Sequence, residues 1–321
     1  MQNFWSKLKR PIFALAPMAD VTDAAFRRVI AKYGKPDVMW TEFVSADGLA
    51  LAPEEGRKKL LLDLVYTEAE RPIVAQFFTS TPENMKKAAE LARELGFDGV
   101  DINMGCPDRS VEKQGAGAAL MKNPKRAREV LRAAQEGAGN LPVSVKTRIG
   151  WNSPELETWL RELLKENPAV VTVHARTRKE MSKVPARWEF VKRAVEIRDE
   201  MGSSALILGN GDVKDLAEAK NRVEETGADG VMIGRGIFGN PWLFSSYIPG
   251  VEEKLRVLIE HTKLFEELLG HTKNFAIMKK HFKAYVNGFD GAAELRGKLM
   301  EAENSVQMET EINQFLQNTA Q

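Results

Sequence analysis

The sequence predicts an α/β fold, a (β/α)8 TIM barrel followed by a C-terminal all-helical domain. Short β-prone segments recur through the first three quarters of the chain, and most are followed by an amphipathic helical segment, which is the barrel pattern. The 321 residues exceed the roughly 250 that such a barrel requires. Beyond Pro249-Gly250 only helical periodicity continues. We therefore expect a catalytic barrel in residues 1–249 and a helical domain in residues 250–321.

The predicted strands each end in a short polar or glycine-containing stretch. They span residues 12–18, 38–43, 73–78, 99–104, 142–149, 169–176, 205–211 and 230–236. The first is followed by apolar residues at helical spacing, Phe26, Val29 and Ile30. The third is followed by a helix that Pro82 starts and Gly96 ends. The exception is residues 44–69, which we predict to be an excursion of the chain over the barrel mouth, with a turn at residues 53–56.

Composition and charge exclude several classes of protein. No apolar run approaches the roughly 18 residues of a membrane span, and no signal-type apolar segment follows the charged N-terminus. A single cysteine excludes an internal disulfide, and with four histidines it gives no zinc-binding spacing. We therefore expect a cytoplasmic protein without a metal. Lysine and arginine number 46 against 45 acidic residues, so any polyanion must bind to a local patch.

The only cysteine follows a predicted strand. The strand of residues 99–104 stops at Gly105, and the proline after Cys106 favours an extended conformation at the thiol. Barrels place their chemistry at the carboxyl ends of strands, and the small residues 115–117 let backbone approach a ligand. Cys106 is therefore a candidate catalytic thiol, with the common role of a buried apolar residue as the alternative.

Two glycine-rich loops follow the seventh and eighth predicted strands. Their sequences are Gly209-Asn-Gly-Asp212 and Gly234-Arg-Gly236. In barrels, the loops at these two positions often bind a phosphate group through backbone N–H groups. Either loop alone is also typical of an ordinary tight turn. Together they favour a phosphorylated ligand.

Three polar side chains interrupt the apolar predicted strands. Lys146 on the fifth strand either points into the barrel, where it needs an anion, or reaches solvent from the strand end. His174 on the sixth is either part of a site or an ordinary core histidine. Gln76 on the third carries an amide that both donates and accepts hydrogen bonds, as a flavin ring requires.

Seven motifs follow one another along the predicted barrel. They are Ala16-Pro-Met-Ala19 with Thr22-Asp23 and Phe26, Asn103-Met-Gly-Cys-Pro107, Gly115-Ala-Gly-Ala-Ala-Leu120, Val145-Lys-Thr-Arg-Ile-Gly150, His174-Ala-Arg-Thr-Arg178, Gly209-Asn-Gly-Asp212 and Gly234-Arg-Gly236. Together they resemble the tRNA-dihydrouridine synthases, from about residue 12 to residue 244. The tail resembles, more loosely, the helical RNA-binding domain of that family. After Arg178 the chain departs from the family pattern, in a stretch that concerns contacts to the substrate and leaves cofactor binding intact.

The resemblance implies an enzyme that reduces the C5–C6 double bond of uracil in tRNA, with FMN as cofactor and NADPH as reductant. Cys106 is then the catalytic acid that protonates C5 after hydride reaches C6, and Asn103 contacts the uracil. A thiol with an ordinary pKa of about 8.5 is protonated at neutral pH, as a proton donor must be. The residues implied to bind FMN are Pro17, Met18, Ala19, Gln76, Lys146, His174, Asn210, Gly211, Asp212, Gly234 and Arg235.

The helical tail contains a local excess of basic residues. Between residues 271 and 298 lie Lys273, Lys279, Lys280, Lys283, Arg296 and Lys298, against Asp290 and Glu294. In a helix three of these lysines fall within about one turn, and Tyr285 would add a stacking surface for RNA. A solvated helix face is the alternative. The residues predicted to bind RNA are Lys279, Lys280, Lys283 and Arg296 of the tail and Arg176 and Arg178 of the barrel mouth.

Two other functions fit part of these observations. An FMN barrel reductase of a small molecule, similar to dihydroorotate dehydrogenase, would share the barrel but has no use for a basic helical tail. A non-catalytic tRNA-binding protein would keep the fold without binding a flavin. We expect a monomer that acts on tRNA.

Overall fold

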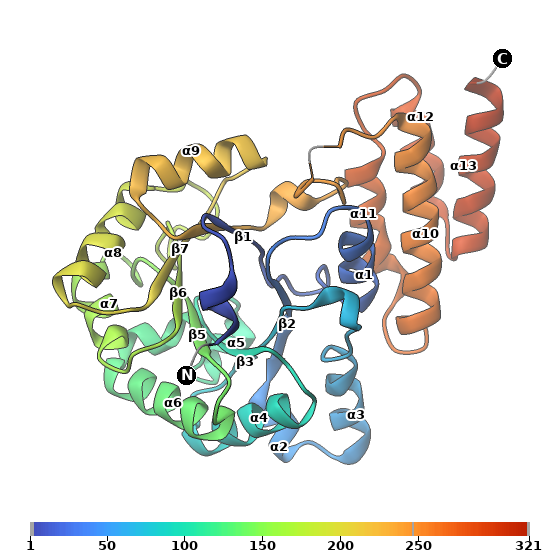
Figure 1. The fold of residues 1–321 in the computed structure, drawn as a ribbon. Helices are drawn as coiled ribbons and strands as arrows, with labels where there is room; N and C mark the ends of the chain where they lie inside the picture. Colours follow the sequence, from blue (N-terminus) through green and yellow to red (C-terminus); the bar gives the residue numbers. More distant parts are fainter. Residues whose placement is uncertain (1–2, 246, 320–321) are drawn as a thin grey trace.

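In the described residues, 3–245 and 247–319 of a computed structural model, eight parallel strands form a barrel (Figure 1). Their order is β1-β8-β7-β6-β5-β4-β3-β2, and a bridge between Ala14 and Val38 joins the two ends of this sheet. The strands are β1 (Ile12–Leu15), β2 (Met39–Ser45), β3 (Ile73–Phe78), β4 (Gly99–Met104), β5 (Val143–Arg148), β6 (Val170–His174), β7 (Leu206–Asn210) and β8 (Gly230–Ile233). The predicted barrel is confirmed, and the predicted strand ends differ from these by up to three residues.

Helices connect the strands and cover the outside of the barrel. Asp23 starts α1 by accepting the backbone N–H of Phe26, and Asn123 caps α6 in the same way. Gly227 ends α9 with a left-handed φ of 71°. These helices are α1 (Ala24–Tyr33), α2 (Ala46–Leu51), α3 (Glu54–Leu62), α4 (Pro82–Glu94), α5 (Arg109–Lys113), α6 (Pro124–Ala138), α7 (Leu156–Leu164), α8 (Glu189–Glu200) and α9 (Leu216–Thr226). Within the described ranges, no helix is long and apolar enough to cross a membrane.

The segment between β2 and β3 is largely helical, so the turn predicted at residues 53–56 is wrong, while the predicted excursion over the barrel mouth stays a prediction. α2 starts directly after β2, where the Ser45 hydroxyl accepts the N–H of Gly48, and it packs against α4. Residues 53–56, predicted to be a turn, instead begin α3. Pro53 lies just before the first turn, where the missing N–H of proline costs nothing, and acidic residues follow it near the positive end of the helix dipole.

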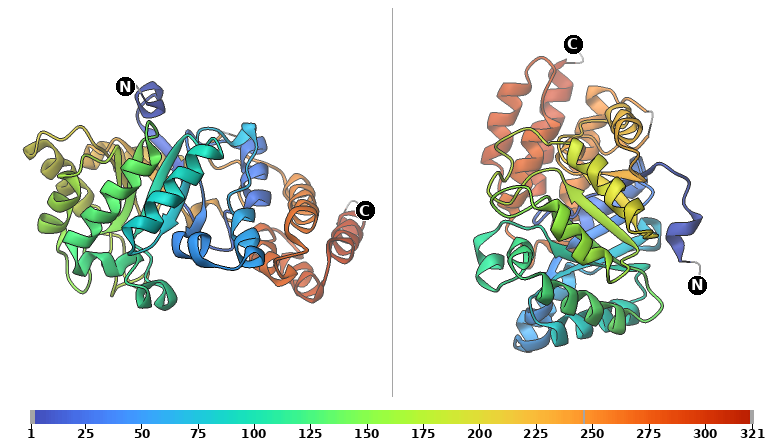
Figure 2. Two further views of the ribbon diagram at one scale, coloured as in Figure 1. Left: turned by 90° about the horizontal axis from the view of Figure 1, so that it is seen from below. Right: turned by 90° about the vertical axis from the view of Figure 1, so that its left-hand side faces the viewer.

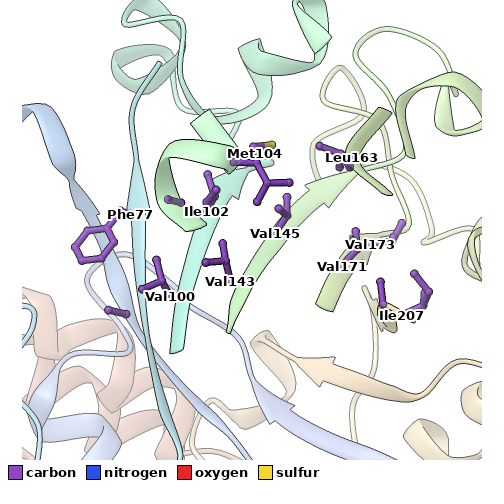
Figure 3. Close-up of a cluster of buried hydrophobic side chains, with 14 of the residues drawn as sticks. Phe77, Val100, Ile102, Met104, Val143, Val145, Leu163, Val171, Val173 and Ile207 are labelled. Carbon is purple, nitrogen blue, oxygen red and sulfur yellow. The ribbon is translucent and has the colours of Figure 1, made fainter. Parts of the chain in front are cut away.

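Strand alternation sorts the barrel side chains into two apolar layers. The outward layer packs against the helices, and Figure 3 shows Val100, Ile102 and Met104 of β4 beside Val143 and Val145 of β5 in it. The inward layer comes mostly from the early residues of the strands: Trp5, Ile12, Ala14, Ala16, Val38, Trp40, Val74, Val170, Leu206, Leu208 and Met232. The later inward positions of β3 to β7 are polar, and they contribute to the site: Gln76, Asn103, Lys146, His174 and Asn210.

The tail forms a unit of four helices beside the barrel within residues 247–319 (Figure 2). They are α10 (Val251–Leu269), α11 (Met278–Tyr285), α12 (Ala292–Glu301) and α13 (Ser305–Thr319), as the periodicity predicts. Their hydrophobic core includes Ala25 and Val29 of α1 and Trp242, and α1 packs against α10. Because the two units share a core, the domain boundary at residues 249 and 250 stays a prediction. Residues 1 and 2 of the first predicted domain and residues 320 and 321 of the second lie outside the described residues.

Candidate active site

A cavity of about 520 Å³ lies at the carboxyl ends of the strands. Its wall is formed by Ala16, Pro17, Met18, Lys146, His174, Arg176, Ser182, Asn210, Gly211, Asp212, Val213, Lys214, Met232, Gly234, Arg235 and Gly236. The fold therefore gathers most of the predicted cofactor residues around one space. Of that predicted set, Ala19 and Gln76 lie outside this wall: Ala19 is exposed at the surface, and Gln76 is buried inside the barrel.

The two glycine-rich loops are packed against each other. A Cβ atom on Gly236 would lie 2.6 Å from the carbonyl oxygen of Val213, in the loop after β7. Gly211 has a φ of 129°, and a Cβ atom there would lie 2.8 Å from the Cβ of Ala186. Only glycine fits these two positions without displacing a neighbour. The two loops therefore line one cavity, and the phosphorylated ligand predicted from them stays a prediction.

Asp212 holds two arginines at the cavity wall. Its carboxylate accepts hydrogen bonds from the guanidinium groups of Arg176 and, at 2.9 Å, Arg235. Burial opposes ionisation here, but the N–H of Ala186 and the Arg176 guanidinium outweigh it and lower the pKa of Asp212. Four cationic side chains and this one carboxylate line the cavity: Lys146, Arg176, Lys214, Arg235 and Asp212. The wall therefore attracts an anion.

Lys146 and His174 are the two residues of the cavity wall whose pKa burial lowers. Lys146 Nζ donates to Asn210 Oδ1 at 3.2 Å. Burial, and next the charge of Arg148, lowers the pKa of Lys146 to about 8. Burial and the same cations hold the pKa of His174 well below 6.5, so its ring is neutral at pH 7. Since an arginine can only donate, the contact of 3.2 Å from Arg176 makes His174 Nε2 the acceptor and places the ring proton on Nδ1.

Cys106 lies in the loop after β4 and is half-buried beside Phe43 and Phe78. Its backbone N–H donates to Asn103 Oδ1 at 2.9 Å. Gly117 packs against the backbone of Cys106: it has a φ of 59°, and a Cβ atom there would lie 2.8 Å from the Cys106 carbonyl oxygen. Burial raises the pKa of the Cys106 thiol, which keeps it protonated at neutral pH. The thiol is thus held on a fixed loop in the form that can donate a proton.

A buried polar chain supports this loop from inside the barrel. Asn103 Nδ2 donates to Gln76 Oε1 at 3.2 Å, and Gln76 Nε2 donates to Asp101 Oδ2 at 2.5 Å. Ser144 also donates to Asp101. Burial raises the pKa of Asp101 to about 6, against the lowering effect of these hydrogen bonds. Gln76 and Asn103 therefore hold the strand ends together, and their contacts to cofactor and uracil stay predictions.

The two arginines predicted at the barrel mouth differ in position. Arg176 is 2% exposed and belongs to the cavity wall, so it lies among the cofactor residues and away from the rim. Arg178 is partly exposed, pairs with Glu112 through two nitrogens, and lies 4.6 Å from the ring centroid of Trp151. Lys122 lies 4.0 Å from the same ring centroid. The rim therefore carries Arg178 and Lys122 around one indole.

The predicted RNA-binding residues of the tail lie on α11 and α12: Lys279, Lys280, Lys283 and Arg296. Lys280 and Lys283 are exposed. Tyr285 is only 1% exposed, so the predicted stacking surface is wrong, because the inward face of α11 takes this ring into the core. Lys273 does not add to this patch either, since its ammonium pairs with Glu42 and Asp63.

The sequence analysis does not predict several residues of the site and its support, among them the polar residues Asp101, Lys214 and Ser182. Strand alternation places Asp101 on the same face as Asn103, and that signal was sufficient to find it. Lys214 is a basic residue two positions after Asp212 in a predicted phosphate loop, which was a second usable signal. Ser182 lies in the stretch where the chain departs from the family pattern, and nothing in its sequence context marks it.

A parallel barrel with a cation-lined cavity at its strand ends, and a thiol on the loop after β4, is the arrangement of a barrel enzyme with a site that favours an anionic ligand. The chain belongs to the dihydrouridine synthase family, whose model, described as "Dihydrouridine synthase (Dus)", matches residues 14–321. The family predicted from the motifs is therefore confirmed.

Named relatives support this membership over nearly the whole chain. The "Probable tRNA-dihydrouridine synthase 2" of Bacillus subtilis (strain 168) is 40% identical, over 98% of this chain and 97% of its own length. The "Probable tRNA-dihydrouridine synthase" of Staphylococcus aureus (strain MRSA252) is 39% identical, over 98% of this chain and 96% of its own length.

Among solved structures, the old yellow enzyme homologue from Zymomonas mobilis is similar with a TM-score of 0.48 at 14% identity, over 72% of this chain and 86% of that chain.

Proposed function

We propose that the protein is a cytoplasmic tRNA-dihydrouridine synthase that reduces the C5–C6 double bond of uridines in tRNA, with FMN as cofactor and NADPH as reductant. The observation that carries this proposal is the cation-lined cavity of a family member, together with the chain's only thiol on the loop after β4. Cys106 is not part of the cavity wall, but it lies near enough to Lys146 of that wall for the lysine charge to lower the pKa of the thiol. The predicted monomeric state stays a prediction.

The residues of the cavity fit FMN in their chemistry. The backbone N–H groups of the two glycine loops and the Arg235 guanidinium suit a phosphate. Burial lowers the pKa of Lys146 to about 8, so an anion near its ammonium would stabilise the charged form. The reduced flavin ring is such an anion. When bound, FMN supplies the hydride for C6 of the uracil. The protein supplies binding, orientation and a proton.

Cys106 supplies that proton to C5 in this proposal. Its raised pKa keeps the thiol protonated, and the hydrogen bond from its N–H to Asn103 fixes the loop. Proton donation by a positioned side chain is typically worth about 10²–10⁴-fold in rate. The thiolate left after the step is stabilised by nearby charge, because Arg148 and Lys146 both lower the pKa of Cys106.

The helical unit holds the RNA through Lys279, Lys280, Lys283 and Arg296, with Arg178 at the rim of the barrel. The target base leaves its stack to reach the cavity, as in other enzymes that act on a base. Exposed lysines on α11 neutralise phosphates without reading sequence.

Incubation of the purified protein with NADPH and an unmodified tRNA transcript tests the proposal, with dihydrouridine measured by mass spectrometry. We expect dihydrouridine to form and the protein to show the absorbance of an oxidised flavin. A flavin-containing protein that reduces a free pyrimidine but no tRNA would instead support the small-molecule reductase. A colourless protein that binds tRNA would support the non-catalytic alternative.

A further inference from the structure

Lys273 joins the helical unit to the barrel through buried ion pairs. It lies in the connection between α10 and α11, and its Nζ is 2.7 Å from Glu42 Oε2 and 2.8 Å from Asp63 Oδ1. The three side chains are 16%, 6% and 21% exposed. A second pair between the two units, Lys32 with Glu260, is 57% and 35% exposed. Of these contacts, only the two that Lys273 makes are sheltered enough to escape most screening by water and salt.

Glu42 also holds the loop that lines the cavity. Its second carboxylate oxygen, Oε1, accepts the backbone N–H of Asp20 at 2.5 Å. Asp20 is in the left-handed region with a φ of 54°, where a residue other than glycine persists only if its surroundings hold it. Two residues earlier, Met18 lines the cavity, and its N–H donates to the Thr22 hydroxyl at 2.9 Å. One carboxylate therefore contacts both the cavity loop and the helical unit.

The charge balance makes Lys273 essential to this arrangement. Burial raises the pKa of Glu42 to about 7, and Lys273 is the group that opposes this rise. The carboxylates of Asp63 and Asp23 raise it further. Without the ammonium, Glu42 would take up a proton or turn toward solvent, and the N–H of Asp20 would lose its charged acceptor.

We propose that Glu42 and Lys273 are positioning residues that couple RNA docking on the helical unit to cofactor retention in the barrel. The inference rests on the proposed function. RNA bound along α11 holds the adjoining α10–α11 connection, which keeps Lys273 on Glu42 and Glu42 on the loop of residues 16–20. Because coupling between two sites is reciprocal, RNA tightens cofactor binding and the cofactor tightens RNA binding.

The release of FMN from the intact holoenzyme after dilution, followed by flavin fluorescence, tests this coupling. In the wild type we expect saturating tRNA to slow release by about fivefold or more. In Lys273→Met the slowing should be smaller, and Lys273→Arg should restore it. Lys32→Met removes the same charge from the other pair between the two units and serves as the matched control, which should behave as the wild type.

Equal slowing in Lys273→Met and Lys32→Met would overturn the inference, since RNA that simply covers the cavity slows release in every variant. Absence of slowing in the wild type would overturn it as well. Both results leave the proposed function standing if FMN and tRNA bind. A wild-type protein that holds no flavin, or binds no tRNA, contradicts the proposed function itself.

Discussion

Lys146 is an inward-facing cation on β5 whose surroundings favour an anion. Its pKa is lowered to about 8 by burial and by Arg148, and its hydrogen bond to Asn210 supplies no charge. A bound anion within reach would raise this pKa again. Of the two alternatives open from the sequence, the structure has the inward one, because the side chain ends in the cavity wall, and the anion that it would meet stays a prediction.

Lys146→Met should weaken FMN retention by roughly tenfold or more, the loss expected for one hydrogen bond to a charged group. The reduction potential of the bound flavin should become more negative, because the reduced anion loses its counter-charge. FMN content after dialysis and titration against a reference dye measure the two effects. Lys179→Met, at an exposed lysine of the rim, is the control. If Lys146→Met and the wild type have equal FMN content and equal reduction potential, Lys146 does not contact the flavin.

At the scale of elements, α11 presents two faces of different chemistry. Met278, Phe282 and Tyr285 pack into the core, while Lys280 and Lys283 face outward. The number of phosphates that such a face neutralises sets how steeply RNA affinity falls with salt. The contribution of α11 to RNA binding can therefore be measured as the slope of log affinity against log salt concentration.

Lys279→Glu combined with Lys283→Glu should weaken tRNA binding and reduce the slope of log affinity against log salt by roughly two. FMN content and NADPH oxidation by an artificial acceptor should be unchanged. Lys58→Glu with Lys59→Glu on α3 makes the same charge change at exposed positions of the barrel side and is the control. An unaltered slope in the α11 variant would mean that the RNA is held elsewhere, around Arg178 and the rim.

The sequence predicted elements whose signals are local. Strand periodicity, the helical spacing of Phe26, Val29 and Ile30 and the glycines of the two loops act within a few residues, and the structure keeps all three. The failures depended on tertiary packing. The sequence predicts a turn at Pro53, but proline also suits the start of a helix. It predicts an exposed Tyr285, but this ring is buried in the core that the helical unit shares with α1. No local signal links Lys273 to Glu42.

At the scale of the whole molecule, the barrel and the helical unit meet in a shared aromatic cluster. His261 of α10 and His281 of α11 lie with ring centroids 4.7 Å apart, and both flank Phe26 of α1. All four ring nitrogens are buried, and none has a hydrogen-bond partner within the part of the chain that the structure describes. Burial lowers the pKa of His261 to about 3, and burial holds the pKa of His281 well below its ordinary value.

This cluster should make the fold sensitive to acid. Both histidines stay neutral when folded, while the unfolded chain takes up protons below a pH of about 6.5, so stability is lost as the pH falls through that value. At pH 5.5, one unit lower, each histidine should cost about 1.4 kcal/mol. Urea unfolding at pH 7.5 and 5.5 measures the difference, which His261→Phe with His281→Phe should reduce. If the double variant loses as much stability as the wild type, the cluster does not carry the effect.

The central claim is that the cavity and Cys106 act together to reduce a uridine in tRNA. Its most direct test is an anaerobic single-turnover experiment in which the enzyme-bound flavin is reduced, mixed with unmodified tRNA, and followed by its absorbance. The wild type should be reoxidised as dihydrouridine forms. Cys106→Ala should keep its FMN and react about 10²–10⁴-fold more slowly. An unchanged rate in Cys106→Ala would remove the thiol from the mechanism, and a wild-type flavin that tRNA does not reoxidise would contradict the claim as a whole.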